Sequence, residues 1–431
     1  MSTNETPNEK TVKSSLWLQR LKDESWEAEL LISTVAIFGT VQMFKLLSRM
    51  VDWFINILPP SQYFFGYGVS FMGLIAISIL TTMFVIHFLM RAYWVGLVGL
   101  NSVFPDYSLE DSAYSEIYTS KMLAILPKLK DTISKVDDLC SVIFSAAFFL
   151  FLMYGYFAII SVIGLLVYVK FGDSIPPTIL IILKWIFFAA VFCQLFFSII
   201  ANLKRFKQNV AIQNIFFNIT RWGSIIMMGP LYKLTMQISM SFATNYKKQK
   251  SLIGIIVAFL VIGFVITLTQ FSNSKMPYLI SSDIVYNESK LYNHYYRSSY
   301  EGDDFLLGPQ IDSEVMEEPL IRLFIPIYSY ESKIASKMYG EVNSDKTLEE
   351  KESRSKKRKA YIKRYSKYHA IKIDGKTISI SFKRYTHPES KQFGVISFVS
   401  IDGYSKGEHT LTIEKKLGEE SKNWEIPFYY Y

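Results

Sequence analysis

Residues 203–250 read LKRFKQNVAIQNIFFNITRWGSIIMMGPLYKLTMQISMSFATNYKKQK. This connector contains no acidic residue, and its eight basic residues are Lys204, Arg205, Lys207, Arg221, Lys233, Lys247, Lys248 and Lys250. Apolar segments of membrane-spanning length lie on both sides of it, at 177–202 and 252–271. Because short loops rich in Lys and Arg stay on the cytoplasmic side of a membrane, the connector predicts a multi-spanning membrane protein and its orientation.

Composition supports this class of protein. Half of the 431 residues are hydrophobic, and the 19% that are charged fall below the globular average of roughly 25%. The formal net charge of +8 predicts contact with anionic lipid of the inner leaflet, and we expect no nucleic-acid partner. The two cysteines, Cys140 and Cys193, stand in separate apolar segments, so we predict neither a disulfide framework nor a metal site.

We predict an α-helical membrane domain at 29–275 with about five transmembrane helices, since a helical crossing needs roughly 20 apolar residues. The spans are expected at 30–58, 64–90, 139–169, 177–202 and 251–272. Residues 1–28 are predicted to be a cytoplasmic arm, disordered at first, and 91–138 and 203–250 to be cytoplasmic loops. Pro59-Pro60 ends the first span because proline cannot continue a helix.

The interior of the connector permits two interpretations. Val210–Met228 is apolar but interrupted by polar residues, and Gly229-Pro230 breaks any helix. Apolar residues then recur at helical spacing from Leu231 to Phe242, so two helices lying on the membrane surface are favoured. The alternative is a sixth span at about 210–232, which would place the C-terminal domain in the cytoplasm.

After Lys275 the hydrophobic residues no longer follow a helical period but alternate or form short runs of strand length. This pattern predicts an all-β, sandwich-like domain at 276–431, of immunoglobulin-like size. The expected strands are Leu320–Ile327, Ile371–Ile373, Thr377–Arg384, Gly394–Ile401, His409–Glu414 and Trp424–Tyr430. Asp374-Gly375 is a strong two-residue hairpin signal, and Asp402-Gly403 is a second turn signal. The highly charged segment Lys346–Lys367 predicts a helical insertion between the early and late strands.

With five spans and the connector inside, the N-terminus is cytoplasmic and the C-terminal domain is extracytoplasmic. A second basic block, Lys351–Arg364, lies in that domain and is the main discordant feature. It does not reverse the orientation, because large domains cross largely regardless of charge. The abundance of Lys, Ile, Phe, Tyr and Asn is typical of low-GC Gram-negative bacteria, so we expect the inner membrane and a periplasmic domain.

Several polar residues stand inside the predicted spans. The candidate intramembrane residues are Lys45, Arg49, Asp52, Lys184 and Gln194. Ionisable groups at such depth are costly and often functional, and these five could line a transport path. The simpler interpretation is favoured: Lys184 extends its charge to the outer surface, and the end of the first span keeps its charges among the headgroups. His87 and Arg91 are expected at the cytoplasmic end of the second span.

We find no phosphate-binding glycine loop, no Gly-x-Ser-x-Gly motif and no His-Glu-x-x-His motif, and we name no catalytic residue and no cofactor. The expected function is that of a non-enzymatic inner-membrane protein whose β-sandwich domain binds an envelope protein or glycan. One alternative is a small-solute or ion transporter or channel. A second alternative is a transmembrane signalling or defence component.

Overall fold

The computed structural model describes residues 7–104, 112–171, 177–245, 250–280, 294–299, 305–339, 350–418 and 420–431. The chain divides into two compact units. The helical unit comprises Met1–Phe44 and Gly73–Leu268, and the β unit comprises Lys45–Met72 and Thr269–Tyr431. The β unit therefore includes a helical hairpin from the membrane region in addition to the C-terminal strands.

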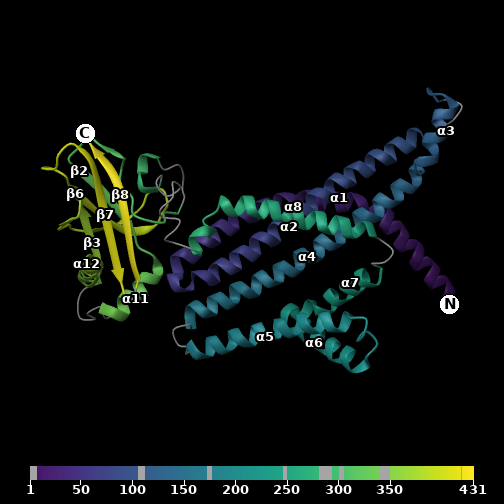
Figure 1. The fold of residues 1–431 in the computed structure, drawn as a ribbon, viewed down its shortest axis with the longest axis horizontal. Coiled ribbons are helices and arrows are strands. Elements are labelled where there is room, and N and C mark those ends of the chain that lie inside the picture. The colour runs from purple at the N-terminus through teal and green to yellow at the C-terminus, as the bar shows by residue number, and fades with distance from the viewer. Residues whose placement is uncertain are drawn as a thin grey trace. The chain divides into compact units, whose positions relative to one another are not determined.

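Long helices dominate the first two thirds of the chain (Figure 1). They are α1 (Pro7–Ile57), α2 (Tyr63–Val103), α3 (Glu116–Ile125), α4 (Leu129–Phe171), α5 (Pro177–Asn202), α6 (Val210–Met228), α7 (Tyr232–Asn245) and α8 (Lys250–Ser272). Pro59 separates α1 from a short 3-10 turn (Pro60–Gln62) that leads into α2, as the Pro-Pro pair predicts. The disordered start expected for the arm is wrong from Pro7 onward, because α1 continues through it without a break.

Three helical stretches of the described residues are long and apolar enough to cross a membrane: Ser25–Ile57, Pro60–Val103 and Glu116–Gly164. Shorter apolar helices are found at Phe192–Asn202 and Val257–Ser272. The helical N-terminal region is thus confirmed, with three long apolar helices.

The core of the helical unit joins α2, α4 and α8. Leu80 and Phe84 of α2, Ile143 of α4 and Phe259 of α8 are buried in one apolar cluster. Gly263 lets α8 approach α2 closely, because a Cβ there would lie 2.9 Å from Cγ1 of Ile79 and 3.2 Å from its Cα. Small residues at such crossings favour helix packing in membranes.

The connector folds into α6 and α7, as its pattern predicts. Asn209 caps α6 by accepting hydrogen bonds from the backbone N–H groups of Ala211 (3.1 Å) and Ile212 (3.3 Å). Gly229, at φ +48°, ends α6 in a conformation that favours glycine. Within the residues that the structure describes, no stretch of α6 or of α5 reaches the length and hydropathy of a span.

Two sheets make up the C-terminal β-rich region. The larger sheet has the order β1-β8-β7-β3-β4 and the smaller sheet the order β2-β6-β5. The strands are β1 (Val315–Met316), β2 (Leu320–Pro326), β3 (His369–Ile373), β4 (Lys376–Ile378), β5 (Lys383–Thr386), β6 (Phe393–Ser400), β7 (Gly407–Leu417) and β8 (Glu420–Tyr430). Except for the parallel pair β1–β8, the strands pair antiparallel within their sheets.

The two sheets share one apolar core. Alternate residues of the smaller sheet, including Leu323 and Val395, face alternate residues of the larger sheet, including Ile373, Ile413 and Ile426. All five are fully buried. The period-2 pattern of the sequence therefore places one face of each sheet in the core.

The Asp374-Gly375 hairpin is confirmed: both residues have positive φ (49° and 77°), as a type I′ turn requires, and the turn joins β3 to β4. The single strand expected at Thr377–Arg384 is wrong. Residues 376–378 pair with β3 in the larger sheet and 383–386 pair with β6 in the smaller one, so the chain changes sheets between them.

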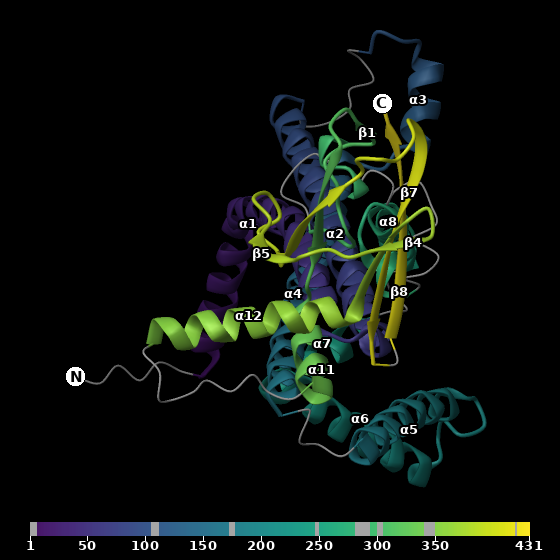
Figure 2. The ribbon, with the colours of Figure 1, turned by 90° about the vertical axis from the view of Figure 1, so that its left-hand side faces the viewer.

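The charged helical insertion is confirmed as α12 (Glu350–Tyr368), which lies crosswise to the strands (Figure 2). Tyr365 and Tyr368, in its last turn, bury their rings in the shared core. A second helix, α11 (Ser329–Tyr339), was not expected. It contributes Ala335 to the same core.

Candidate functional sites

A buried charge cluster joins three helices of the helical unit. The guanidinium group of Arg91 on α2 is only 1% exposed. Its Nη1 donates to Oδ1 of Asp137 on α4 at 2.6 Å, and its Nη2 donates to the carboxylate of Glu29 on α1. A buried arginine is tolerated when carboxylates and hydrogen bonds compensate its charge, and two carboxylates do so here.

His87, one turn before Arg91, belongs to the same cluster. Its ring is fully buried, Nδ1 lies 2.7 Å from the hydroxyl of Ser33, and Nε2 lies 3.6 Å from Oε2 of Glu29. The guanidinium of Arg91 lies over the ring of Trp94, 5.0 Å from its centroid. His87 and Arg91 thus both lie in the packed interior of the helical unit, a burial that their expected place at the end of the second span did not predict.

The cluster lies where three apolar runs end. Glu29 directly precedes the run of α1, Arg91 follows that of α2, and Asp137 stands two residues before that of α4. Charges at this level mark a membrane surface, since the hydrocarbon core excludes them. The sequence shows that each of these charges stands at the end of an apolar run. It does not show that Glu29, Arg91 and Asp137 pair, because the pairing depends on which helices are neighbours.

The β unit contains an ion pair near the C-terminal end of the apolar run of α1. Lys275 Nζ lies 3.1 Å from Oδ1 of Asp52. Along α1, Glu29 and Asp52 are 23 residues apart, or about 35 Å at the helical rise. This length is close to the roughly 30 Å thickness of a bilayer core, so Glu29 and Asp52 are about one membrane thickness apart along α1, with Lys45 and Arg49 between them.

The five candidate intramembrane residues fall into different parts of the structure. Lys45, Arg49 and Asp52 belong to the β unit; the first two are exposed, and Asp52 pairs with Lys275. Gln194 belongs to the helical unit, where its Oε1 lies beside Gly223 of α6. The side chain of Lys184 lies outside the described residues.

Five of the eight basic residues of the connector are described, and all five side chains are exposed: Lys204, Arg205, Lys207, Arg221 and Lys233. Lys247, Lys248 and Lys250 lie outside the described side chains. Exposure leaves these cations available to a charged surface, which is compatible with the predicted lipid contact.

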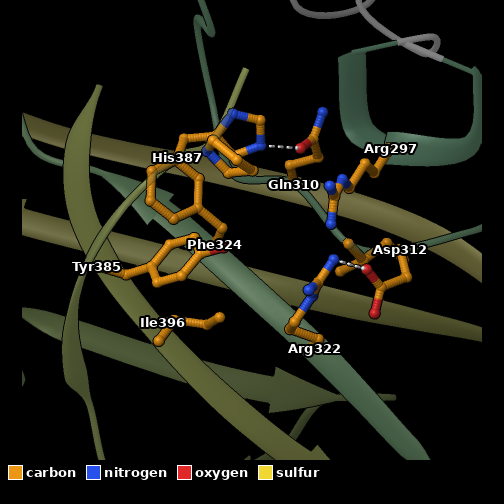
Figure 3. A pocket seen from close by; sticks show the side chains of 10 residues that line it. Arg297, Gln310, Asp312, Arg322, Phe324, Tyr385, His387 and Ile396 are labelled. Atoms are coloured by element: carbon orange, nitrogen blue, oxygen red, sulfur yellow. Dashed lines mark hydrogen bonds and ion pairs between the residues drawn. The ribbon is translucent and has the colours of Figure 1, made fainter. Parts of the chain in front are cut away.

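The β unit carries a recess on the outer face of its smaller sheet (Figure 3). Arg322 and Phe324 of β2, Ile396 of β6 and Tyr385 of β5 line one part of it. Arg297 and the short segment Gln310–Asp312 supply the other wall. Backbone hydrogen bonds in both directions between Gln310 and Phe324 fix this wall to the sheet edge.

The floor of the recess depends on Gly394. A Cβ at this position would lie 2.3 Å from the carbonyl oxygen of Ile325 and 2.6 Å from the ring of Phe324. Because Gly394 has no side chain, the ring of Phe324 can lie directly over β6 at this position. Tyr385 then packs against it edge-to-face, at 6.0 Å between centroids.

Two guanidinium groups point toward one another in the recess (Figure 3). Arg297 pairs with Glu389 at 3.0 Å and Arg322 pairs with Asp312 at 2.5 Å, and each arginine side chain remains about one third exposed (33% and 31%). The facing cations repel each other unless anions lie beside them. The paired carboxylates reduce this repulsion, and an incoming anionic group would reduce it further.

His387 closes one side of the recess as a neutral ring. Its Nδ1 accepts the backbone N–H of Ser390 at 3.2 Å, which leaves Nε2–H to donate to Oε1 of Gln310 at 2.9 Å. Burial lowers the pKa of His387 below its ordinary value, and the nearby cations, including Arg297 and Arg322, lower it further against the opposing effect of Glu389. The residues of the recess are widely spaced in the sequence, so no local motif could have revealed it.

Within the β unit, α11 and β8 contact residues of or beside the helical hairpin 45–72. The amide of Ser329 donates to Oδ1 of Asn56 at 3.0 Å. Lys422 of β8 donates to the hydroxyl of Tyr278 at 3.1 Å and lies over the ring of Tyr63 at 5.8 Å. The tip of the α1–α2 hairpin and the sandwich therefore form one compact body.

Comparison of the chain with protein-family models, with curated proteins and with solved structures finds no match. The kind of protein must therefore be inferred from the structure alone. It has a helical region with three helices fit to cross a membrane, followed by a two-sheet β-rich region.

Proposed function

We propose that this chain is a non-enzymatic integral protein of a bacterial inner membrane whose β unit binds an envelope protein or glycan outside the cytoplasm. About five helices would cross the membrane, with α5 and α8 joining the three long ones. The N-terminus and the connector would lie in the cytoplasm, as the positive-inside rule predicts.

The recess of the smaller sheet is the observation that supports a binding role. It combines two partly exposed arginines with aromatic rings, the residue types that carry most of the energy at protein interfaces. Phe398, which pairs with Arg322 on the same outer face, is 51% exposed beside it. The facing guanidinium groups favour a partner that presents a carboxylate or another acidic group.

A photo-crosslinking residue in place of Phe398 tests this proposal in intact cells. We expect one discrete envelope product that disappears when Arg322→Glu is added, because the reversed charge repels an acidic partner. The matched control is Lys376→Glu, an exposed position on β4 of the other sheet, which should leave the product intact. Equal loss in both variants, or no product, would exclude the recess as the binding site.

The contacts between the sandwich and the hairpin favour a second candidate function, signalling across the membrane. A partner bound to the sandwich would act on Asn56 and Tyr63, and hence on the helices α1 and α2. The transporter alternative stays a prediction, because three of its five candidate residues belong to the β unit, one belongs to the helical unit, and the side chain of Lys184 lies outside the described residues.

A further inference from the structure

A cleft of about 280 Å³ opens between α2 and α4 in the helical unit. It is lined by Trp94, Val98 and Asn101 of α2 and by Lys130, Ile133, Ser134 and Asp137 of α4. Its size approaches that of sites for small ligands. The Arg91 cluster forms its base, since Asp137 belongs to both and Arg91 lies over Trp94.

The position of the cleft indicates the environment of its occupant. Its α2 residues follow Arg91 by three to ten positions, which is about 5 to 15 Å along the helix axis. Arg91 stands where the apolar run ends, so this interval begins in the headgroup layer of the bilayer. Val98 is apolar and 38% exposed, and it lies at the level of the headgroup rather than of the acyl chains.

The polar groups of the cleft define the chemistry of the occupant. In the part of the chain that the structure describes, the buried Nε1 of Trp94 and the buried Oδ1 of Asn101 have no hydrogen-bond partner. Buried polar atoms are normally satisfied, so a ligand that enters the cleft and displaces the side chains covering these two atoms would supply the missing acceptor and donor. Lys130 adds an exposed ammonium group, while one oxygen of Asp137 is engaged by Arg91.

The order of these groups along the helices is informative. Trp94 lies nearest the apolar core and Asn101 lies farthest from it. Because α2 and α4 are antiparallel at the Arg91–Asp137 contact, Lys130 lies between these levels, near Val98. A phosphate would meet Trp94 Nε1–H and Lys130, and a hydroxyl group beyond it would donate to Asn101 Oδ1. A terminal ammonium would instead be repelled by Lys130.

We propose that this cleft binds the headgroup of an anionic, hydroxyl-bearing phospholipid of the phosphatidylglycerol type. The phosphate accepts hydrogen bonds from Trp94 and Lys130, and a glycerol hydroxyl donates to Asn101. This site lies between α2 and α4 and is distinct from the connector, whose described cations are exposed. The proposal of a lipid site does not depend on the function proposed for the β unit.

Native mass spectrometry of the full chain in detergent, with equal amounts of phosphatidylglycerol and phosphatidylethanolamine, tests the proposal. We expect preferential retention of one phosphatidylglycerol, reduced about fivefold by Lys130→Ala, as one basic residue near a lipid surface contributes. Trp94→Phe, which keeps a ring but removes Nε1–H, and Asn101→Leu should also weaken it. The control Lys128→Ala removes an exposed lysine that does not line the cleft and should leave retention unchanged.

Equal retention of the two lipids would overturn the proposal, since the cleft would then not distinguish the headgroups. Equal losses in Lys130→Ala and Lys128→Ala would also overturn it, since they indicate unspecific charge attraction. Displacement of the lipid by soluble glycerol 3-phosphate at similar concentration would show that the acyl chains contribute nothing and would contradict a lipid site. A lipid-free dimer in which the cleft is covered by a second copy would contradict it as well.

Discussion

Replacing Arg91 with methionine is expected to destabilise the helical unit by about 3–5 kcal/mol, the cost of removing one partner from a buried ionic group. Glu29 and Asp137 would then face each other across an apolar gap with no cation between them. Methionine retains much of the volume, so the loss comes from charge and not from a cavity. No other described contact in the helical unit joins α1, α2 and α4 through charges in this way.

Thermal unfolding of the full chain in detergent measures this effect, and Lys121→Met provides the control because Lys121 is exposed. Adding Glu29→Gln and Asp137→Asn to Arg91→Met should recover part of the stability, since no unpaired carboxylate then remains. If Arg91→Met unfolds at the same temperature as Lys121→Met, the cluster does not hold the three helices together.

Replacing Glu331 with glutamine is expected to cost the β unit a similar amount, about 3 kcal/mol or more. Its Oε1 lies 2.6 Å from Lys415 Nζ, and both side chains are buried (1% and 6% exposed). Lys415 also donates to the carbonyl oxygen of Pro326 at 3.3 Å, and Glu331 is the buried carboxylate that pairs with it. Glutamine keeps the shape and loses the charge.

Hydrogen exchange of the amides of β7 and α11 in the full chain would detect this loss, because the pair joins these two elements. Glu414→Gln is the matched control: it breaks the partly exposed pair with Lys372 on neighbouring strands and should change protection little. Similar protection in the two variants would mean that the buried pair contributes no more than an exposed one.

Much of the fold could be predicted because local patterns determine it. Period-2 alternation or apolar runs of strand length located β2, β3, β6, β7 and β8, and the Asp374-Gly375 turn identified the hairpin between β3 and β4. The split of 377–384 between two sheets could not be predicted, since alternation does not reveal which strand is the partner. α11 was missed because its short, weakly apolar pattern resembles a loop.

The candidate sites were predicted less well, for a physical reason. Glu29, Arg91 and Asp137 each look like an ordinary charge at a membrane surface, and only helix packing makes them one buried cluster. In the recess, Arg297 and Arg322 meet because a loop segment returns to the edge of β2. Such long-range contacts leave no local periodicity in the sequence.

The sidedness of the β unit tests the central claim most directly. A cysteine placed at Ser405, an exposed loop residue, in a variant without Cys140 and Cys193 should react with a membrane-impermeant maleimide in cells whose outer membrane alone is permeabilised. A cysteine at Lys207 of the connector should react only after the inner membrane is broken. The opposite pattern, with Lys207 reached first, would place the β unit in the cytoplasm and contradict an envelope partner.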